Sequence, residues 1–194
     1  MSTRTAKRPS PSRVEVLRVP VVPVRDNVHF PLLISTLLVG RELSLRALQH
    51  AINSGRMVCV LGQKDVSIDD PRADDLFRVG TLSEVVQVMP MPDGTMRVVL
   101  RGVARAKVSS VQYRSGYLKA EYETLPEQVV AGPTSEALRR EAIEAFNQIA
   151  SLGKQVPIEV LEILPSIEDA GHLADLLTDH LNLRPAVKQE LLEE

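Results

Sequence analysis

The sequence predicts an α+β protein in which a small β-barrel or β-sandwich, with one helix, precedes a partial α-helical bundle. Short β-rich runs separated by turn residues extend from residue 14 to residue 125. After residue 133 the apolar spacing changes to three or four residues, as on one face of a helix. The formal net charge of -2 divides into +6 for residues 1–125 and -8 for residues 126–194, which indicates two regions with different surfaces.

The amino terminus and the composition exclude several classes of protein. Residues 1–13 hold four basic residues, two prolines and no acid, so we expect a disordered basic tail, with a nucleic-acid-binding arm as the alternative. No apolar run is long enough for a transmembrane helix, and no secretory signal follows the basic start. Cys59 is the only cysteine, which excludes an intrachain disulfide framework and fits a cytoplasmic location.

The segment 14–125 is expected to form the barrel. Pro20 and Pro23 interrupt the first apolar run, which predicts an edge strand because proline has no amide donor. The period of 41–53 predicts a helix that ends near Gly55, and a long polar loop is expected at 63–78. The further expected strands are 32–39, 56–62, 79–89, 95–101, 103–111 and 117–124, with a hairpin turn at Pro92-Asp93-Gly94.

A linker is predicted at 126–133, and helices are predicted over 134–194. Thr134 or Ser135 can cap the first of these helices, and Ser166 with Asp169 resembles a capping box. Pro157 and Pro185 suit the first turns of two others. The last helix begins an apolar stripe, Val187, Leu191 and Leu192, with no later helix to pack on it. We therefore expect an incomplete helical domain and a chain that forms the front part of something longer, with a frayed terminal helix as the alternative.

An ordered set of motifs over residues 17–194 resembles the start of the ATP-dependent Lon proteases. The motifs in the amino-terminal half are Val19-Pro20-Val21-Val22-Pro23-Val24-Arg25-Asp26, Phe30-Pro31, Val39-Gly40-Arg41, Gln63-Lys64-Asp65, Asp70-Pro71 and Asp75-Leu76-Phe77-Arg78-Val79-Gly80-Thr81. Later motifs are Met91-Pro92-Asp93-Gly94-Thr95, Gly102-Val103-Ala104-Arg105-Ala106, Ile158-Glu159-Val160-Leu161, Asp175 to Leu181, and Lys188-Gln189-Glu190-Leu191-Leu192. Thr36, where the family usually has proline, and His29, where a β-branched residue is common, depart from the pattern.

The resemblance implies a PUA-like β-barrel followed by the first helices of a helical domain. In the family this region captures unfolded or damaged proteins and helps to hold a hexameric ring. The resemblance places ATP, magnesium and the serine–lysine catalytic pair in downstream modules, so no cofactor is expected in this chain. The sequence contains no G-x-x-x-x-G-K-[ST] motif, and no serine has recognisable catalytic surroundings, so this chain is not expected to be an enzyme.

Other polar, cysteine and tyrosine residues could carry chemistry, but a structural role is favoured for each. His172, Asp175, Asp179 and His180 could meet near one helix face, but the wet face of an amphipathic helix is favoured over a metal site. The acidic residues between Asp65 and Asp75 lack an EF-hand pattern, and Cys59 is expected to be a buried, inert thiol. Tyr113 and Tyr117 beside Arg114 and Lys119 could stack on RNA, but alternating faces of a β-hairpin are favoured.

Two apolar segments are the candidate sites for protein binding. Methionine adapts to many apolar partners, and prolines weaken strand pairing, so we expect part of the segment 89–96 to project from the sheet. The candidate substrate-binding residues are Phe30, Pro31 and Leu32, together with Met89, Met91 and Met96; Arg41 and Glu42 are added as candidates for substrate or interdomain contacts. The alternative is that Phe30, Met89 and Met96 fill the barrel core.

The sequence therefore predicts a non-enzymatic chain that recognises unfolded or damaged proteins and belongs to a protease that assembles as a hexamer. The first alternative is a standalone adaptor or chaperone-like binding protein of the same fold. An RNA-binding PUA-like protein is the second alternative, and it is disfavoured because aromatic residues make up only 3% of the chain. No membrane partner is expected.

Overall fold

The computed structural model describes residues 17–127, 132–153 and 156–194. The tail predicted at 1–13 and the middle of the linker predicted at 126–133 lie outside these residues. The strands are β1 (Leu17–Val24), β2 (Ile34–Val39), β3 (Met57–Gly62), β4 (Val79–Pro90), β5 (Met96–Arg114) and β6 (Tyr117–Thr124). The helices are α1 (Glu42–Asn53), α2 (Pro133–Ser151), α3 (Ile158–Ile163), α4 (Ala170–His180) and α5 (Pro185–Glu193), with short 3₁₀ turns at Ala73–Asp75 and Leu164–Ser166.

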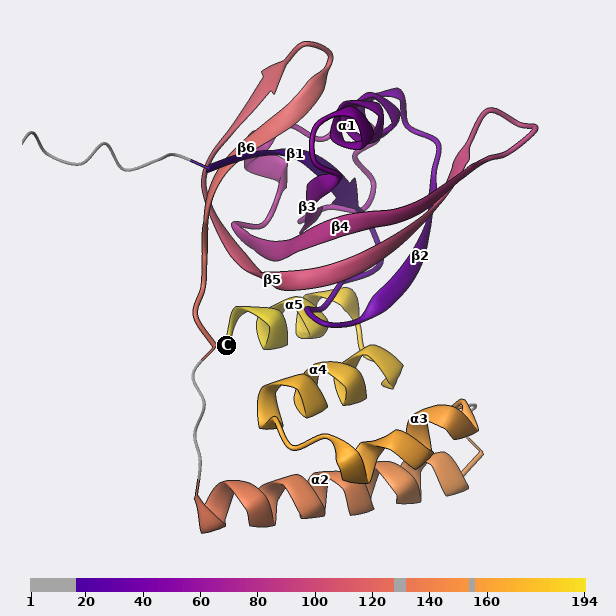
Figure 1. Cartoon of the computed structure of the whole chain (residues 1–194), viewed down its shortest axis with the longest axis vertical. Helices are drawn as coiled ribbons and strands as arrows, with labels where there is room; N and C mark the ends of the chain where they lie inside the picture. The colour runs from indigo at the N-terminus through magenta and orange to yellow at the C-terminus, as the bar shows by residue number, and fades with distance from the viewer. Residues whose placement is uncertain (1–16, 128–131, 154–155) are drawn as a thin grey trace, which may run out of the picture.

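The strands form one sheet that closes into the predicted barrel. Its order is β2-β5-β4-β3-β1-β6, and a further pairing of β6 with β5 closes a ring from β5 to β6 that leaves β2 outside. Two clusters of valine, leucine and alanine fill the interior, and α1 packs against one of them through Ala47, Leu48 and Ala51. Figure 1 shows α1 across one end of the barrel and the other four helices stacked below it, with α5 nearest and α2 farthest. The predicted α+β class is confirmed.

The long strand β5 corrects the prediction of two separate strands at 95–101 and 103–111. It continues through Gly102, where a Cβ atom would lie 2.2 Å from the carbonyl oxygen of Phe30. Gly102 therefore interrupts the hydrophobic pattern of β5 because the segment at Phe30 crosses the strand at this point. The strand itself does not end there. Because of its length, β5 can pair with β2 and β4 near its start and with β6 near its end.

The prediction that β1 is an edge strand is wrong. The strand lies between β3 and β6, but its first half, which contains Pro20, pairs with β6, and its second half, which contains Pro23, pairs with β3. Each half of the strand therefore has one ladder partner and one side without a ladder. A proline, which has no N–H to donate, can be accepted in such a half although the strand as a whole lies inside the sheet.

The predicted local turns agree with the structure more closely than the predicted caps. Gly55, after α1, and Gly94, in the β4–β5 turn, both have positive φ as expected. The helix α2 begins at Pro133, with Gly132 at the cap position, so Thr134 and Ser135 do not cap it. The expected capping box is also wrong, because Asp169 itself is the N-cap of α4 and accepts from the backbone N–H of His172 at 2.6 Å.

No helix in the described residues is both long and apolar enough to span a bilayer.

The helix α5 packs against the barrel, which corrects the expectation that its apolar residues lack a partner. Leu192 is 1% exposed and belongs to a cluster with Val28 and Phe30. The side chain of Gln189, also buried, donates from Nε2 to the carbonyl oxygen of Val79 in β4 at 2.9 Å. The terminal helix is thus a structural element of the junction.

A buried ion pair connects the barrel to the helices at the same place. The guanidinium of Arg105 in β5 donates to both carboxylate oxygens of Asp175 in α4, at 2.6 and 3.0 Å, and to the carbonyl oxygen of Leu192 at 3.1 Å. Asp175 is 3% exposed, so the prediction that it lies on a wet helix face is wrong. One arginine therefore joins β5, α4 and α5.

Burial and the pairing with Arg105 change the pKa of the Asp175 carboxyl group in opposite directions. Desolvation raises the pKa of Asp175, while the hydrogen bonds and the charge of Arg105 oppose that rise. A raised pKa means that folding disfavours the ionised carboxylate, so the pairing with Arg105 does not fully offset the cost of burying Asp175.

A double-mutant cycle tests the energetic coupling between Arg105 and Asp175. Arg105→Met alone leaves Asp175 buried without its partner and is expected to lower the free energy of unfolding by about 3–5 kcal/mol. The double variant Arg105→Met/Asp175→Leu should regain most of that loss, because neither charge is then buried. The measurement is urea denaturation of each variant. The exposed pair of Arg18 and Glu121 supplies the control, since Arg18→Met should cost less than about 1 kcal/mol. Simple additivity of the two junction changes would contradict the prediction.

Candidate functional site

The three residues predicted as a binding segment, Phe30, Pro31 and Leu32, differ in how far they are exposed. Phe30 is 1% exposed and Pro31 is buried; Phe30 packs with Val28 and Leu192 beside α5, outside the two clusters that fill the barrel. Leu32 is half exposed and has a φ of 61°, and its backbone N–H donates to the carbonyl oxygen of Gly102 at 3.1 Å. This unusual conformation turns the chain from the buried segment into β2.

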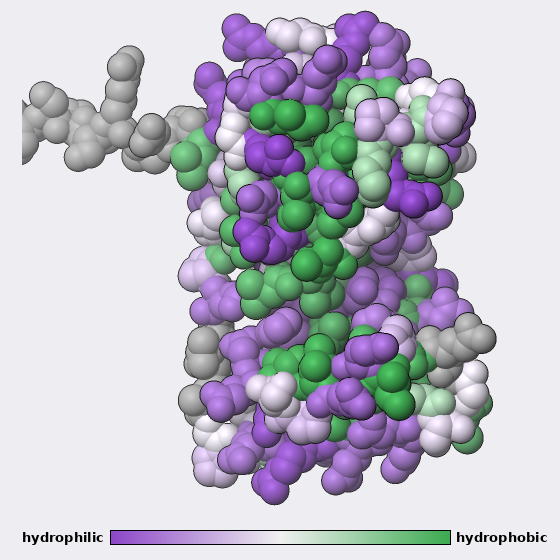
Figure 2. Space-filling view, turned by 45° about the vertical axis from the view of Figure 1, so that its right-hand side comes forward, coloured by the Kyte–Doolittle hydropathy of each residue, from purple (hydrophilic) through white to green (hydrophobic). Residues whose placement is uncertain are grey.

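The most exposed apolar side chains near this segment lie on β2. Ile34 is 68% exposed and Leu38 is 66% exposed, with Thr36 between them on the same side of the strand. Val99 of β5 is the cross-strand partner of Thr36 and lies on that side as well. We call Ile34, Thr36, Leu38 and Val99 the β2 face. Figure 2 views this side of the barrel and shows apolar side chains, in green, gathered among polar ones.

Sequence reasoning did not select Ile34 or Leu38 as site residues. The run 32–39 is dense in leucine and isoleucine, a pattern that buried strands also show. Only the three-dimensional structure shows that one face of β2 is left uncovered. The absence of a charged residue from this run was the available signal, because exposed edge strands normally carry charges.

The methionine side chains of the β4–β5 hairpin are neither fully exposed nor fully buried. Met89, Met91 and Met96 are all partly buried, and Met96 packs against the barrel core. Asp93 Oδ1 accepts from the backbone N–H and the hydroxyl of Thr95, which fixes the turn. The hairpin is therefore ordered by its own hydrogen bonds, and its methionines offer only part of their surface to a partner.

The guanidinium of Arg41 forms hydrogen bonds within the fold. It donates to the carbonyl oxygens of Pro23 and Asp69, at 2.9 and 3.2 Å, and to the side chain of Gln63. These bonds join the start of α1 to the end of β1 and to the 63–78 loop. Glu42, in contrast, is exposed and forms an ion pair with Arg46 one turn later.

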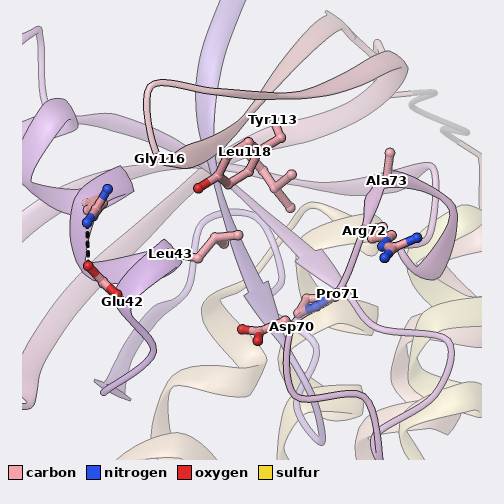
Figure 3. Close-up of a pocket in the computed structure, with 10 residues that line it drawn as sticks. Glu42, Leu43, Asp70, Pro71, Arg72, Ala73, Tyr113, Gly116 and Leu118 are labelled. Carbon is pink, nitrogen blue, oxygen red and sulfur yellow. Dashed lines mark hydrogen bonds and ion pairs between the residues drawn. The ribbon is translucent and has the colours of Figure 1, made fainter.

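A cleft of about 610 Å³ lies beside Glu42, between α1, the 70–73 segment and the β5–β6 hairpin (Figure 3). Leu43, Pro71 and Leu118 supply apolar surface. Gly116 has a φ of 86°, and a Cβ atom there would lie 2.3 Å from Nη1 of Arg46, so this arginine lies against the hairpin turn. The remaining lining residues are Glu42, Asp70, Arg72, Ala73 and Tyr113, which give the cleft charges of both signs.

The described residues contain no group of three or more histidine, cysteine, aspartate or glutamate side chains able to hold a metal ion. Cys59 is fully buried, and burial raises the pKa of its thiol to about 12, so the nucleophilic thiolate does not form near neutral pH. Tyr113 is 68% exposed, but Tyr117 is buried and its ring stacks on His50 at 5.1 Å. These two tyrosines therefore do not form a joint platform for bases.

Comparison with protein-family models assigns residues 18–194 to the ATP-dependent protease La (LON) substrate-binding domain. Similar curated proteins include the Lon protease of Escherichia coli (strain K12), which is 38% identical over 184 residues, 95% of this chain and 24% of that protein. The Lon protease of Azorhizobium caulinodans is 40% identical over 174 residues, 90% of this chain and 20% of that protein. The chain thus spans about a quarter of the length of the first of these relatives and a fifth of the second.

Solved structures share the fold. The N-terminal domain of a Lon protease from the Mycobacterium avium complex superposes with a TM-score of 0.72 at 21% identity, covering 92% of this chain and 90% of that one. A Lon N-terminal domain protein from Xanthomonas campestris gives a TM-score of 0.65 at 18% identity, covering 92% of this chain and 91% of that one. At these identities the likeness supports the fold alone.

The stability of the segment that leads into β2 is expected to depend on pH. His29 is 5% exposed, its Nδ1 lies 2.8 Å from the hydroxyl oxygen of Ser35 in β2, and its Nε2 has no partner in the described residues. Burial lowers the pKa of His29 from 6.5 to about 4. Between these pH values the unfolded chain binds a proton that the folded chain does not, so stability should fall by up to about 3 kcal/mol as the pH drops.

Urea denaturation at a series of pH values tests this expectation. His29→Leu should flatten the decline in unfolding free energy between pH 6.5 and 4. His50→Gln, at an exposed position, is the matched control and should leave the decline in place. An unchanged decline in His29→Leu would show that other groups cause it.

Proposed function

The chain belongs to the family of Lon substrate-binding domains, and from this membership we propose that it recognises unfolded or damaged proteins through exposed apolar surface. Family membership supports a role in binding protein substrates. The proposal adds the kind of substrate, the surface that binds it and the purpose of binding, which is delivery to ATP-driven degradation.

The observation that carries the proposal is the exposure of Ile34 and Leu38. Each leaves about two thirds of its surface in water, on the same side of one strand. Removing such surface from water is favourable by about 25 cal/mol per Å², so an apolar segment of another chain gains free energy by covering it. Apolar surface that is gathered on one face, and not scattered singly, is characteristic of interaction sites. A folded protein keeps most of its own apolar segments covered, so this surface favours unfolded chains.

Two neighbouring features support a broad choice of substrate. The partly buried methionines of the β4–β5 hairpin have flexible and polarizable side chains that can adapt to different apolar groups. The cleft beside Glu42 has room for apolar side chains and offers charges of both signs at its rim. We propose Leu32 and the hairpin methionines as secondary contacts. Arg41 is proposed as a residue that holds the scaffold, since its bonds lie within the fold.

The chemistry of degradation is proposed to reside elsewhere in a longer protein. The relatives are about four to five times longer than the part matched by this chain. We propose that ATP, magnesium and the peptide-cleaving groups act in those further parts, and that the longer protein assembles as a hexameric ring in the cytoplasm. Weak individual contacts would then gain strength from several copies that act on one substrate.

The first experiment is a titration of the purified chain with one protein in its native and in its unfolded state, at two salt concentrations. Binding to the unfolded form alone, with little dependence on salt, is the expected result, because apolar contacts are not screened by ions. Equal binding to the native form, or a steep loss of binding with added salt, would count against the proposal.

Substitution of the β2 face locates the binding surface. Ile34→Ser/Leu38→Ser is expected to weaken binding of the unfolded protein about tenfold, since burial of such side chains contributes about 1–2 kcal/mol. Leu152→Ser is the matched control, because Leu152 is 85% exposed but lies after α2, far along the chain from the barrel. Met91→Ser should have a smaller effect, because Met91 is already partly buried. Equal losses in all three variants would refute a localised site.

A further inference from the structure

Among the described residues, no strand pairs with one backbone edge of β2. Within this part of the chain β2 pairs with β5 alone and stands at the end of the sheet order. In an antiparallel ladder each residue directs its N–H and C=O groups to one side, and successive residues alternate. The residues of β2 whose polar groups point to the free edge can therefore be identified from the bonds of β5.

The β4–β5 turn fixes this alternation at one end of β5. The backbone N–H of Met91 donates to the carbonyl oxygen of Thr95 at 2.9 Å, so the next pair, Pro90 and Met96, is a pair without mutual hydrogen bonds. Pro90 has no N–H, which agrees with this assignment. Met96 therefore directs its backbone polar groups away from β4 and toward β2.

The other end of the β2 ladder gives the same alternation. The N–H of Gly102 donates to the carbonyl oxygen of Leu33 at 2.8 Å, so even-numbered residues of β5 face β2. Their partners in β2 are the odd-numbered residues. The free edge is thus formed by the N–H and C=O groups of Ile34, Thr36 and Leu38.

This edge lacks the side chains that usually block strand addition. From Leu32 to Val39 the chain has no charged residue, no proline and no glycine. Exposed edge strands in soluble proteins are normally protected by charges, prolines or bulges, because an open edge is a template for pairing with another chain. The unprotected edge is formed by Ile34, Thr36 and Leu38, which also supply three of the four residues of the β2 face.

A groove of about 530 Å³ runs beside the free edge. Residues from both faces of β2 line it, Thr36 from the outer face and Leu37 from the inner one, which places the groove along the edge. Its other wall includes the end of β1, where the carbonyl oxygen of Pro23 already accepts a hydrogen bond from Arg41. An extended chain in this groove would therefore find its backbone partners on β2.

The surroundings define the side chains that such a segment needs. Residues opposite Ile34 and Leu38 must be apolar to cover them, and the period of a strand makes these alternate residues. Arg97 of β5, the partner of Leu38, is exposed and makes no ion pair with the described residues, so it favours an acidic residue on the incoming strand.

We infer that β2 captures substrates by β-strand addition: an extended polypeptide segment, with apolar residues at alternate positions and an acidic residue near Arg97, pairs with the free edge at Ile34, Thr36 and Leu38. This inference rests on the proposed function and adds to it the conformation and the side-chain pattern of the substrate. Backbone hydrogen bonds supply affinity that is independent of sequence, and the alternating apolar contacts supply the preference.

Thr36→Pro separates this inference from simple apolar contact. It removes the central N–H of the free edge, breaks no bond to β5 and leaves Ile34 and Leu38 in place. Thr36→Val is the matched control, because it keeps both the N–H and the β-branched shape. The probe is a short synthetic peptide of alternating valine and threonine with one glutamate. Thr36→Pro should weaken its binding about tenfold, and Thr36→Val should leave it unchanged.

A modified peptide keeps the test independent of the folding of the proline variant. The same peptide with N-methyl groups on alternate backbone nitrogens retains its side chains but cannot form the ladder. It should bind the unaltered chain about tenfold more weakly. Replacing the glutamate by lysine should also weaken binding, and Arg97→Gln should remove that difference. Equal binding of the methylated and unmethylated peptides would overturn strand addition.

The outcomes also separate the inference from the proposed function. If unfolded protein binding is lost in Ile34→Ser/Leu38→Ser but unchanged in Thr36→Pro, the apolar surface binds substrate without strand addition. If neither variant loses binding, the proposed site itself is wrong. If the chain forms a dimer that Thr36→Pro dissociates, a second copy of β2 occupies the edge, and the inference about substrate is overturned.

Discussion

The contact between Arg105 and Asp175 is the constraint on which the arrangement of the two parts of the chain depends. Because Arg105 also binds the carbonyl oxygen of Leu192, one guanidinium fixes two helices against the barrel. The docking of α5 in turn buries Leu192 against Phe30. Phe30 begins the segment that leads into β2, so the junction holds the start of the candidate binding strand as well as the helices.

The position of β2 follows from the length of β5. A strand of ordinary length would close the barrel and leave no part free for another partner, whereas β5 has 19 residues and pairs with β2 over its first six. Gly102 ends that shared stretch by letting the chain at Phe30 cross over the strand. The place of β2 at the end of the sheet therefore depends on one long strand and one glycine, both of which lie outside β2.

The sequence predicted the features that depend on local chemistry. The helix at α1, the β4–β5 turn and the order of barrel and helices all follow from residue spacing and from residues such as Gly94. It could not predict features that depend on distant partners. Asp175 is polar, so its helix position suggests a surface, and only the approach of Arg105 shows why it is buried. Ile34 and Leu38 occupy an apolar run typical of a core, but in the fold no described element covers the face on which they lie.

The open edge of β2 is a hazard as well as a candidate site, because strands of this kind also promote aggregation. The structure limits that hazard by making the edge short and by placing it beside the wall formed by the end of β1. At the same time the bond between His29 and Ser35 and the buried Phe30 hold β2 in a fixed register. A strand held in this way loses little conformational entropy when it pairs, so even a short ladder can contribute to capture of a flexible chain.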